Sequence, residues 1–439
     1  MNVAVIGGGY AGFAAAVTLA DAGVAVTVYE AARELGGRAR RVLVNGVALD
    51  NGLHILIGAY RETLRLVREV HATPSEALTR LPLDWQVHQR FRLKAAPLPA
   101  PLHLAFGVFM ARGASWRERL AAARFVCAMR AQHFRLLEDI SVSALLAAHG
   151  QGPAFQRYFW EPLCLAALNT PPAIASAQVF LNVLRDGALA HRSAGDMLLA
   201  RGDLSTLFPE PAANHVRTHG GRVELGSRVE GLVHTGEAVG VKTQRDTRWY
   251  TQVICAVSPY SAAALIAALP GLKDIAATLD QLRYQPIYSV YLQLTKSVRL
   301  PAPMLGLTGL AQWVFDREAL CGQRGLLAAV ISGKGAHQGM TQEELARKVY
   351  GELDAEFGPL PPLAWHRVIA EKRATFECAV GVKRPSTRTP LAHVHLAGDY
   401  TASDYPATLE AAVRSGMAAA AQVLESGVGA QEALARQSL

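Results

Sequence analysis

The chain has 439 residues, with 44 lysines and arginines against 36 aspartates and glutamates, which gives a formal net charge of +8 at pH 7. Hydrophobic residues make up 51% of the chain and charged residues 18%, a composition that excludes general disorder and supplies a large apolar core. The positive excess is spread along the chain, so it gives no sign of a nucleic-acid partner. At this length we expect one very large domain or two interleaved domains.

The cysteines and the longest uncharged stretch bear on compartment and membrane insertion. Five cysteines lie far apart, with no C-x-x-C pair and no Cys/His spacing typical of zinc, so we predict reduced thiols, a cytoplasmic protein and no metal site. The stretch Pro162 to Leu184 contains three prolines and two asparagines that would interrupt a spanning helix. We therefore expect no transmembrane segment and no secretory signal.

The first thirty residues carry the signals of a strand, a glycine turn, a helix and a second strand. Val3 to Ile6 is a continuous apolar run typical of a buried parallel strand. The turn Gly7 to Gly12 follows it and leads into an alanine-rich helical stretch from Phe13 to Ala22. A second strand, Val24 to Tyr29, ends at Glu30. This order predicts the opening βαβ unit of a nucleotide-binding domain.

The composition and the predicted secondary structure change four times further along the chain. Proline-rich turns and helical patterns begin near residue 72, short strands return near residue 204, helices and strands mix from about residue 262, and a strand, a Gly-Asp turn and a helix close the chain. We predict an α/β fold in which a Rossmann-type FAD/NAD(P)-binding domain holds an inserted mixed α/β substrate domain. The predicted nucleotide-binding segments are 1–71, 204–261 and 385–430, and the substrate segments are 72–203, expected to be helical, and 262–384.

The glycine turn has the spacing that a dinucleotide requires. Gly7 permits the tight turn, Gly9 lets the backbone approach a pyrophosphate, and Gly12 lets the helix pack closely on the strand. The helix N-terminus faces the phosphate charge. Glu30 ends the second strand about twenty residues on, where an acid accepts hydrogen bonds from ribose hydroxyls. The alternative is a glycine-rich βαβ unit that binds nothing.

Two further segments favour FAD over NAD. Gly36-Gly37-Arg38 follows the ribose acid closely, with an arginine able to meet a pyrophosphate. Near the other end, Gly398-Asp399 forms a turn after a strand, and a helix begins near Ala407. Separated segments that converge on one nucleotide suit a long, extended ligand. The dipole of the second helix would stabilise an anionic reduced flavin without a charged side chain.

These motifs, with His219 to Leu225, resemble the FAD-dependent amine oxidase and phytoene desaturase superfamily over nearly the whole chain. Five shorter stretches are similar to the squalene-associated FAD-dependent desaturases, the hydroxysqualene dehydroxylase family of bacterial hopanoid pathways. Two residues depart from that pattern: Leu53 replaces an expected glutamine, and Ala411 replaces a common glycine. The five stretches are Asp50 to Tyr60, Pro162 to Pro171, Val183 to Asp186, Gln312 to Asp316 and Gly398 to Pro406.

The resemblance implies a non-covalently bound FAD, since no cysteine lies near the Gly398-Asp399 turn. It also assigns the valine after the Gly-Gly strand, Val229, to a backbone contact with the adenosine part. The predicted cofactor-binding residues are Gly7, Gly9, Tyr10, Ala11, Gly12, Glu30, Ala31, Gly36, Gly37, Arg38, Val229, Gly398, Asp399, Ala407, Thr408 and Leu409.

The activity implied by the resemblance is a reduction. Hydroxysqualene loses its allylic hydroxyl as water, and a hydride from N5 of the reduced flavin reaches the resulting carbon. This step needs an acid for the leaving hydroxyl, and His54, Asp50 and Asp186 are the candidates, each with an ordinary structural role as the alternative. Aromatic side chains would line the pocket, or else belong to the core: Tyr60, Trp160, Tyr288, Tyr291 and Trp313.

A long isoprenoid substrate implies delivery from lipid, because the transfer of each methylene group into water costs about 0.8 kcal/mol of free energy. The apolar stretch Ala95 to Ala111 is followed by several arginines, which suits either peripheral association with the inner face of a membrane or an ordinary surface. No second nucleotide motif is present, so we expect an external electron donor. Three rival functions stay open: a carotenoid or phytoene desaturase, an amine oxidase, and a non-catalytic prenyl-binding module.

Overall fold

The computed structural model describes residues 1–437, together with the side chains of all of these except 188, 189 and 427–437. Its nucleotide-binding half is a five-stranded parallel sheet in the order β10-β2-β1-β14-β20. Central β1 pairs in parallel with β2 on one side and with β14 on the other. This is the Rossmann strand order, and the predicted fold class is confirmed. The strands are β1 (Asn2–Ile6), β2 (Ala25–Tyr29), β10 (Arg222–Glu224), β14 (Gln252–Cys255) and β20 (Val394–Leu396).

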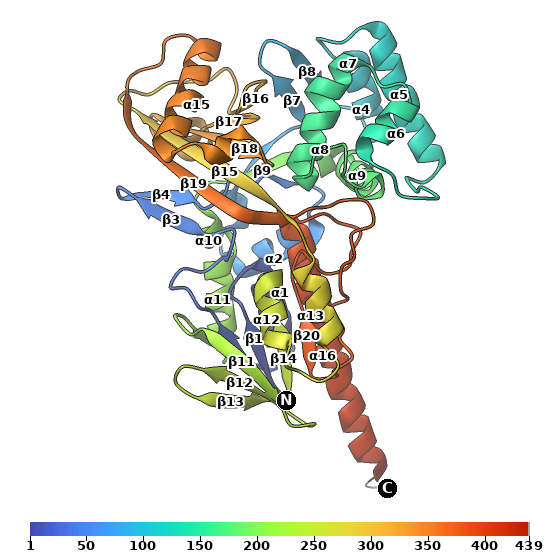
Figure 1. The fold of residues 1–439 in the computed structure, drawn as a ribbon, viewed down its shortest axis with the longest axis vertical. Helices are drawn as coiled ribbons and strands as arrows, with labels where there is room; N and C mark the ends of the chain where they lie inside the picture. Colours follow the sequence, from blue (N-terminus) through green and yellow to red (C-terminus); the bar gives the residue numbers. More distant parts are fainter. Residues whose placement is uncertain (438–439) are drawn as a thin grey trace.

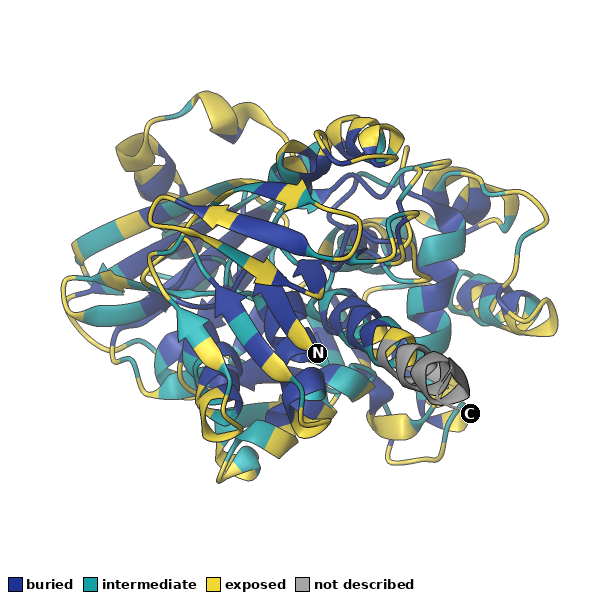
Figure 2. Ribbon diagram, turned by 90° about the horizontal axis from the view of Figure 1, so that it is seen from below, coloured by how far each residue is buried: buried dark blue, intermediate teal, exposed yellow. Residues whose placement is uncertain are grey.

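The sheet collects strands from three distant parts of the chain, and Figure 1 shows them together in the lower half of the molecule. Most residues of β1, β2, β14 and β20 are buried, as the dark centre of Figure 2 shows, whereas the edge strand β10 has no buried residue. Burial on both faces explains why the central strand β1 is a continuous apolar run without alternation. The surrounding elements are α1 (Tyr10–Asp21), α11 (Pro209–Thr218), α12 (Pro259–Ile266), α13 (Lys273–Asp280), α16 (Leu409–Gln437) and the antiparallel sheet β11 (Val229–His234), β12 (Val239–Thr243) and β13 (Thr247–Tyr250).

Two helices from opposite ends of the chain, α1 and α16, pack closely because their contact surface is made of small residues. A Cβ atom on Gly416 of α16 would lie 2.1 Å from the carbonyl oxygen of Ala11. Ala14 of α1 is fully buried beside this contact. The close approach brings the first turn of α1 near the start of α16. The Gly7 to Gly12 turn and the Gly398-Asp399 turn of the predicted cofactor site therefore meet here.

The other half of the molecule is built on a seven-stranded sheet in the order β19-β15-β18-β17-β16-β7-β8. Its two long strands, β15 and β19, cross the middle of the molecule and join the two halves (Figure 1). An apolar cluster fills the space between this sheet and α15 (Gln342–Phe357). The strands are β7 (Asp84–Val87), β8 (Phe91–Lys94), β15 (Tyr284–Leu294), β16 (Met304–Gly306), β17 (Trp313–Asp316), β18 (Leu326–Ser332) and β19 (Leu363–Phe376).

Residues 72–203 are mainly helical, but the expectation of a helical segment is incomplete because four strands also lie there. β7 and β8 form a hairpin that joins the seven-stranded sheet through β16, a pairing of distant residues that no local pattern signals. The other two strands are β6 (Leu78–Leu81) and β9 (Met197–Ala200), and the helices are α3 (Pro74–Ala77), α4 (Leu102–Phe109), α5 (Trp116–Ala131), α6 (Val142–Ala148), α7 (Pro153–Phe155), η1 (Gln156–Trp160), α8 (Glu161–Leu168), α9 (Ala177–Leu184), η2 (Arg185–Leu189) and η3 (Arg192–Gly195).

The remaining elements lie around the junction of the two halves. They are β3 (Arg41–Val44), β4 (Val47–Asp50), β5 (Leu56–Ile57), α2 (Arg61–Val70), α10 (Leu204–Leu207), α14 (Arg317–Cys321) and η4 (Ala336–Gly339). Within residues 1–437, no helix combines the length and the apolar character needed to cross a bilayer.

Candidate active site

The glycine turn between β1 and α1 has the geometry that the spacing predicts. Gly7 adopts φ +115°, a left-handed conformation that favours glycine. A Cβ on Gly12 would lie 1.9 Å from the carbonyl oxygen of Gly7, so only glycine allows this turn to close. Gly9 differs, because the nearest atom to a Cβ placed there is the carbonyl oxygen of Gly36 at 3.8 Å. The backbone of Gly9 therefore faces open space at the N-terminus of α1, where Tyr10, Ala11 and Gly12 form the first turn.

Glu30 lies at the carboxyl end of β2, next to this turn. Its carboxylate accepts hydrogen bonds from the backbone N–H groups of Gly8 and Ala32, each at 2.7 Å. The backbone of Glu30 also binds the segment after β10, since Ser227 donates to its carbonyl oxygen at 2.8 Å. That segment leads into Val229, the first residue of β11. The fold thus brings the predicted adenosine-contacting residues Glu30, exposed Ala31 and Val229 into one region.

The second glycine pair lies against the first. Gly36 forms a parallel bridge with Gly9 and donates its N–H to the carbonyl oxygen of Gly8 at 2.9 Å. Arg38 follows, and its guanidinium binds the buried carboxylate of Asp399 at 2.5 Å. The ion pair joins residues that are 361 positions apart. Gly37, Arg38, Gly398 and Asp399 therefore belong to one site.

The start of α16 closes this site from the C-terminal side. The N–H of Gly398 donates to the hydroxyl of Ser415 at 2.7 Å, which ties the Gly-Asp turn to the helix. Thr408 caps α16, because its hydroxyl accepts from the N–H of Ala411 at 3.1 Å. Ala407 and Leu409 flank the cap and are half-buried.

Two buried hydroxyl groups at the site, those of Tyr284 and Tyr400, have no hydrogen-bond partner among the described residues. Both rings lie near the Arg38–Asp399 pair, whose charges act on the pKa values of both tyrosines. Buried hydroxyls normally have partners, so these two fit a ligand that brings its own polar groups. With the open space at Gly9, they fit FAD.

His54 stands beside the same ion pair. Its Nδ1 lies 2.7 Å from the carbonyl oxygen of Gly52. Because a carbonyl only accepts, Nδ1 carries the hydrogen and Nε2 keeps its lone pair. Burial lowers the pKa of His54 below its ordinary value of 6.5, and the charge of Arg38 lowers it further. The imidazole is therefore mostly neutral at pH 7, and its protonated form is a stronger acid than an ordinary imidazolium.

Asp50 is a buried structural link. One carboxylate oxygen accepts from the N–H of Leu204 at 2.8 Å, and the other lies 3.8 Å from the guanidinium of Arg317. Its backbone oxygen accepts from the hydroxyl of Tyr291 at 2.9 Å. Burial raises the pKa of Asp50 to about 6. Since both carboxylate oxygens have protein partners, these contacts support a structural role.

Asp186 belongs to a second ion pair away from the glycine turns. Arg185 binds both of its carboxylate oxygens, at 2.7 and 3.0 Å, and the hydroxyl of Tyr405 donates to one of them at 3.1 Å. Burial opposes ionisation here, but the hydrogen bonds from Arg185 prevail and hold the pKa of Asp186 below its ordinary value. An aspartate held in its anionic form is a poor proton donor at neutral pH.

The five aromatic residues predicted for the pocket lie in different local surroundings, although ring contacts join the two tryptophans. Tyr60 is half-buried at the start of α2, and the ring of Tyr288 stands edge-on to His337 at 4.7 Å. Tyr291 is fully buried against Asp50. Trp160 and Trp313 belong to one aromatic cluster, in which Trp160 contacts Phe159, Phe159 contacts Trp85, and Trp85 contacts Trp313.

Several polar residues around the site were not among the predicted site residues. Asn51 donates to the carboxylate of Glu371 at 3.3 Å. The guanidinium of Arg373 lies over the ring of Tyr260, 4.5 Å from its centre, and 5.8 Å from the centre of Tyr284. The position of Asn51, directly before Gly52 and His54, was the available signal. No sequence pattern marked Tyr284 on β15 or Glu371 and Arg373 on β19 as site residues.

Glu410 is a further missed residue, and it fixes the position of α16. Its fully buried carboxylate accepts from the N–H and the hydroxyl of Thr63, at 2.9 and 2.8 Å, and from Arg414 at 2.7 Å. It therefore caps the N-terminus of α2 from the first turn of α16, which holds the two helices together.

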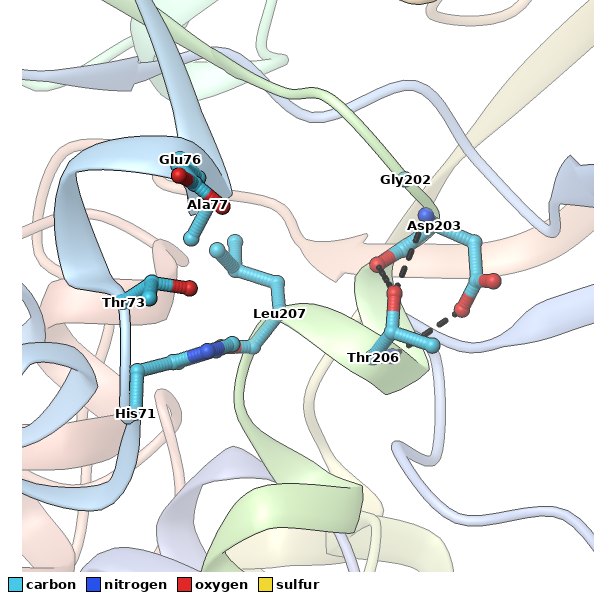
Figure 3. A pocket seen from close by; sticks show the side chains of 8 residues that line it. All are labelled: His71, Thr73, Glu76, Ala77, Gly202, Asp203, Thr206 and Leu207. Atoms are coloured by element: carbon cyan, nitrogen blue, oxygen red, sulfur yellow. Dashed lines mark hydrogen bonds between the residues drawn. The ribbon is translucent and has the colours of Figure 1, made fainter.

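Two other features of the structure lie outside this site. Figure 3 shows a pocket lined by the α2–α3 connection and by α10, and none of its eight residues is a predicted site residue. On the surface, Asp21, His215 and His219 place ligand atoms within 4.8 Å of one another. The carboxylate of Asp21 already binds His215 at 2.6 Å. Such a surface cluster is common without a metal ion, so the prediction of no metal site stays a prediction.

The family model of the flavin containing amine oxidoreductases matches residues 10–424. The chain belongs to this family. It is 30% identical to the hydroxysqualene dehydroxylase of Rhodopseudomonas palustris, covering 97% of this chain and 99% of that protein. It is 29% identical to the protein of the same name from Sinorhizobium fredii, covering 95% and 97%. The predicted family resemblance is confirmed.

Two further proteins are similar at lower sequence identity. The zeta-carotene desaturase of Synechocystis sp. is 24% identical, with 99% of each chain covered. The cyclohexylamine oxidase of Brevibacterium oxydans IH-35A has the same fold, with a TM-score of 0.72 at 18% identity over 97% of this chain and 99% of that one. The present chain, as a member of the flavin containing amine oxidoreductase family, is an FAD-dependent oxidoreductase, as the glycine motifs predict.

Proposed function

We propose that the protein reduces hydroxysqualene to squalene with loss of water. The observation that carries the proposal is the similarity to two hydroxysqualene dehydroxylases along almost the whole of both chains. In this reaction the allylic C–O bond breaks, the hydroxyl leaves as water after taking up one proton, and a hydride forms the new C–H bond. FAD supplies that hydride when it is bound in its reduced form. Two electrons per turnover come from an external donor.

The cofactor-binding roles follow from the positions of the residues. The first turn of α1 and the open backbone at Gly9 suit the pyrophosphate, and Glu30 suits the ribose hydroxyls. Arg38 and Asp399 hold the two glycine segments together at the flavin side. The helix dipole at the start of α16 favours negative charge there. We propose these roles for the predicted cofactor-binding residues.

The proton for the leaving hydroxyl is best assigned to His54. Asp50 has protein partners on both carboxylate oxygens, and Asp186 is held as an anion. His54 lies at the Arg38–Asp399 pair, and hydrogen bonding to Gly52 fixes its ring so that Nε2 is the free atom. When protonated at Nε2, His54 donates readily, because its pKa is low. The rate of the protonation step should therefore rise as the pH falls toward that pKa.

The two-part organisation assigns separate tasks to separate segments. We propose that residues 1–71, 204–261 and 385–430 bind FAD, while 72–203 and 262–384 hold the isoprenoid. The substrate would come from lipid, because it gains about 0.8 kcal/mol for each methylene kept out of water. We therefore place the protein at the inner face of a membrane rather than in the bulk cytoplasm.

Anaerobic single turnover tests the function. Protein with chemically reduced FAD is mixed with detergent-dispersed hydroxysqualene, and the absorbance of oxidised flavin is followed while products are separated by gas chromatography. Squalene formed in equal amount to reoxidised flavin is the expected result. The control is the same protein with oxidised flavin, which should leave hydroxysqualene unchanged. No squalene from reduced protein would contradict the proposal.

A desaturase is the second candidate, since a zeta-carotene desaturase is 24% identical over nearly the full length. A desaturase removes hydrogen and so needs the oxidised flavin. Phytoene or zeta-carotene that bleaches the oxidised flavin, with hydroxysqualene inert toward the reduced one, would favour this candidate. Purified protein without flavin absorbance would instead favour the non-catalytic prenyl-binding module.

A further inference from the structure

Helix α4 presents an apolar face to the exterior. The side chains of Leu102, Phe106, Phe109 and Met110 are 58%, 49%, 69% and 56% exposed. Their spacing of three, four, seven and eight residues places them on one side of the helix. The opposite side is the buried one, with His103 and Gly107. This arrangement reverses the usual pattern, in which the apolar side of a helix faces the core.

Contacts in the C-terminal half of α4 hold the helix in this orientation. A Cβ on Gly107 would lie 2.7 Å from the carbonyl oxygen of Lys94, so the helix backbone rests directly on the strand β8. At the last residue of the helix, the guanidinium of Arg119 donates to the carbonyl oxygen of Phe109 at 3.0 Å, and it also donates to that of Ala114 at 3.1 Å. Rotation of α4 to bury its outer face would break these contacts.

The apolar surface continues onto the start of α5. Trp116 and Leu120 are 68% and 41% exposed. The guanidinium of Arg117 lies 5.6 Å from the centre of the Trp116 ring, a combination of aromatic ring and cation that is common at membrane interfaces. We call Leu102, Phe106, Phe109, Met110 and Trp116 the α4 face. Figure 1 shows α4 and α5 at the opposite end of the molecule from β11, β12 and β13.

The charges around the α4 face are mainly positive. Residues 98–140 contain six arginines and three acidic residues, a net charge of +3. Arg112 and Arg117 are exposed beside the face. The acid closest in sequence, Glu118, is bound by the protein, since its carboxylate accepts from the N–H groups of Ser115 and Ala154 at 2.8 Å each. The rim of the face is therefore cationic.

We propose that the α4 face docks on an anionic lipid bilayer, with its apolar side chains inserted below the headgroups and Arg112 and Arg117 at the phosphates. A cationic rim around an apolar centre is complementary to such a surface. A second copy of the chain is a poorer partner, because a symmetric contact through this face would set its arginines against themselves. The choice of lipid also rests on the proposed function, since an isoprenoid substrate must be collected from a membrane.

Vesicle sedimentation tests the docking surface. FAD-loaded protein is mixed with vesicles of phosphatidylcholine alone or with 30% phosphatidylglycerol, and the bound fraction is measured. The wild type should bind the anionic vesicles, and the double variant F106S/F109S should bind at least about tenfold less. Arg117→Glu should reduce binding to anionic vesicles. The matched control is Leu43→Ser, which removes a 65% exposed leucine on β3 and should change nothing.

Turnover separates this inference from the proposed function. The F106S/F109S protein should convert detergent-dispersed hydroxysqualene at the wild-type rate but lose conversion of substrate embedded in vesicles. Wild-type protein that fails to bind anionic vesicles, or a double variant that binds as well as wild type, would overturn the docking surface while dispersed-substrate turnover stands. Vesicle binding without turnover in either form would instead count against the proposed function. A wild-type dimer in ultracentrifugation that F106S/F109S abolishes would also overturn the inference, in favour of contact between copies.

Discussion

Gly9 and Gly12 belong to the same motif, and the structure predicts opposite consequences for replacing them with alanine. At Gly9 the new methyl group meets no protein atom closer than 3.8 Å, and the backbone angles, φ −92° and ψ −174°, are open to alanine. At Gly12 the methyl group would lie 1.9 Å from a carbonyl oxygen of the neighbouring turn. The first substitution should therefore leave the fold intact, and the second should disrupt it.

The magnitudes follow from these contacts. Gly9→Ala should leave the free energy of unfolding of the FAD-free protein unchanged, or raise it by about 0.4–1 kcal/mol through the unfolded chain. The same methyl group fills the space proposed for the pyrophosphate, an overpacking that costs about 1–3 kcal/mol. FAD affinity should fall by about 5- to 150-fold as a result.

Two measurements check the pair of variants. Flavin fluorescence titration gives the FAD dissociation constant, and thermal unfolding with and without added FAD gives the stability of each form. Gly9→Ala should lose most of the stabilisation by FAD while keeping the melting temperature of the FAD-free protein, and Gly12→Ala should lower both. Wild-type FAD affinity in Gly9→Ala would refute the placement of the pyrophosphate at this turn.

Three further predictions concern buried titratable groups. Glu410→Gln removes the anion that caps α2 and should lower the free energy of unfolding by about 1–3 kcal/mol in urea titration; an unchanged midpoint would show that the cap is dispensable. Burial raises the pKa of Asp50 from 3.8 to about 6, so stability should fall by up to about 3 kcal/mol as the pH rises from 4 to 6, because the unfolded chain releases this proton first. Asp50→Asn should remove that part of the slope, and an identical pH profile would contradict it. Burial lowers the pKa of His54, so its ring-proton NMR resonance should titrate with a midpoint below 6.5, and a midpoint at or above 6.5 would remove the electrostatic basis for its assignment.

The local backbone requirements of this protein could be read from its sequence. The turn from Gly7 to Gly12 depends on a contact between residues five positions apart, so the spacing of its glycines predicts the turn directly. The continuous apolar strands of the parallel sheet are equally local signals. For these reasons the Rossmann fold and a dinucleotide site were predictable from the residues, and the same short-range logic placed Glu30 at the end of β2, whereas the family came from the resemblance of the motifs.

The ionisation states and orientations of side chains were decided by tertiary structure. The sequence offered His54 as an acid with Asp50 and Asp186 as alternatives, and their partners, the Arg38–Asp399 pair, Arg317 and Arg185, distinguish them. A pKa depends on desolvation and on charges within a few ångströms, and these groups are brought together from positions up to hundreds of residues apart. The outward turn of the α4 face had the same origin. Its apolar sequence is compatible with either burial or exposure, and the contact of Gly107 with β8 selects exposure.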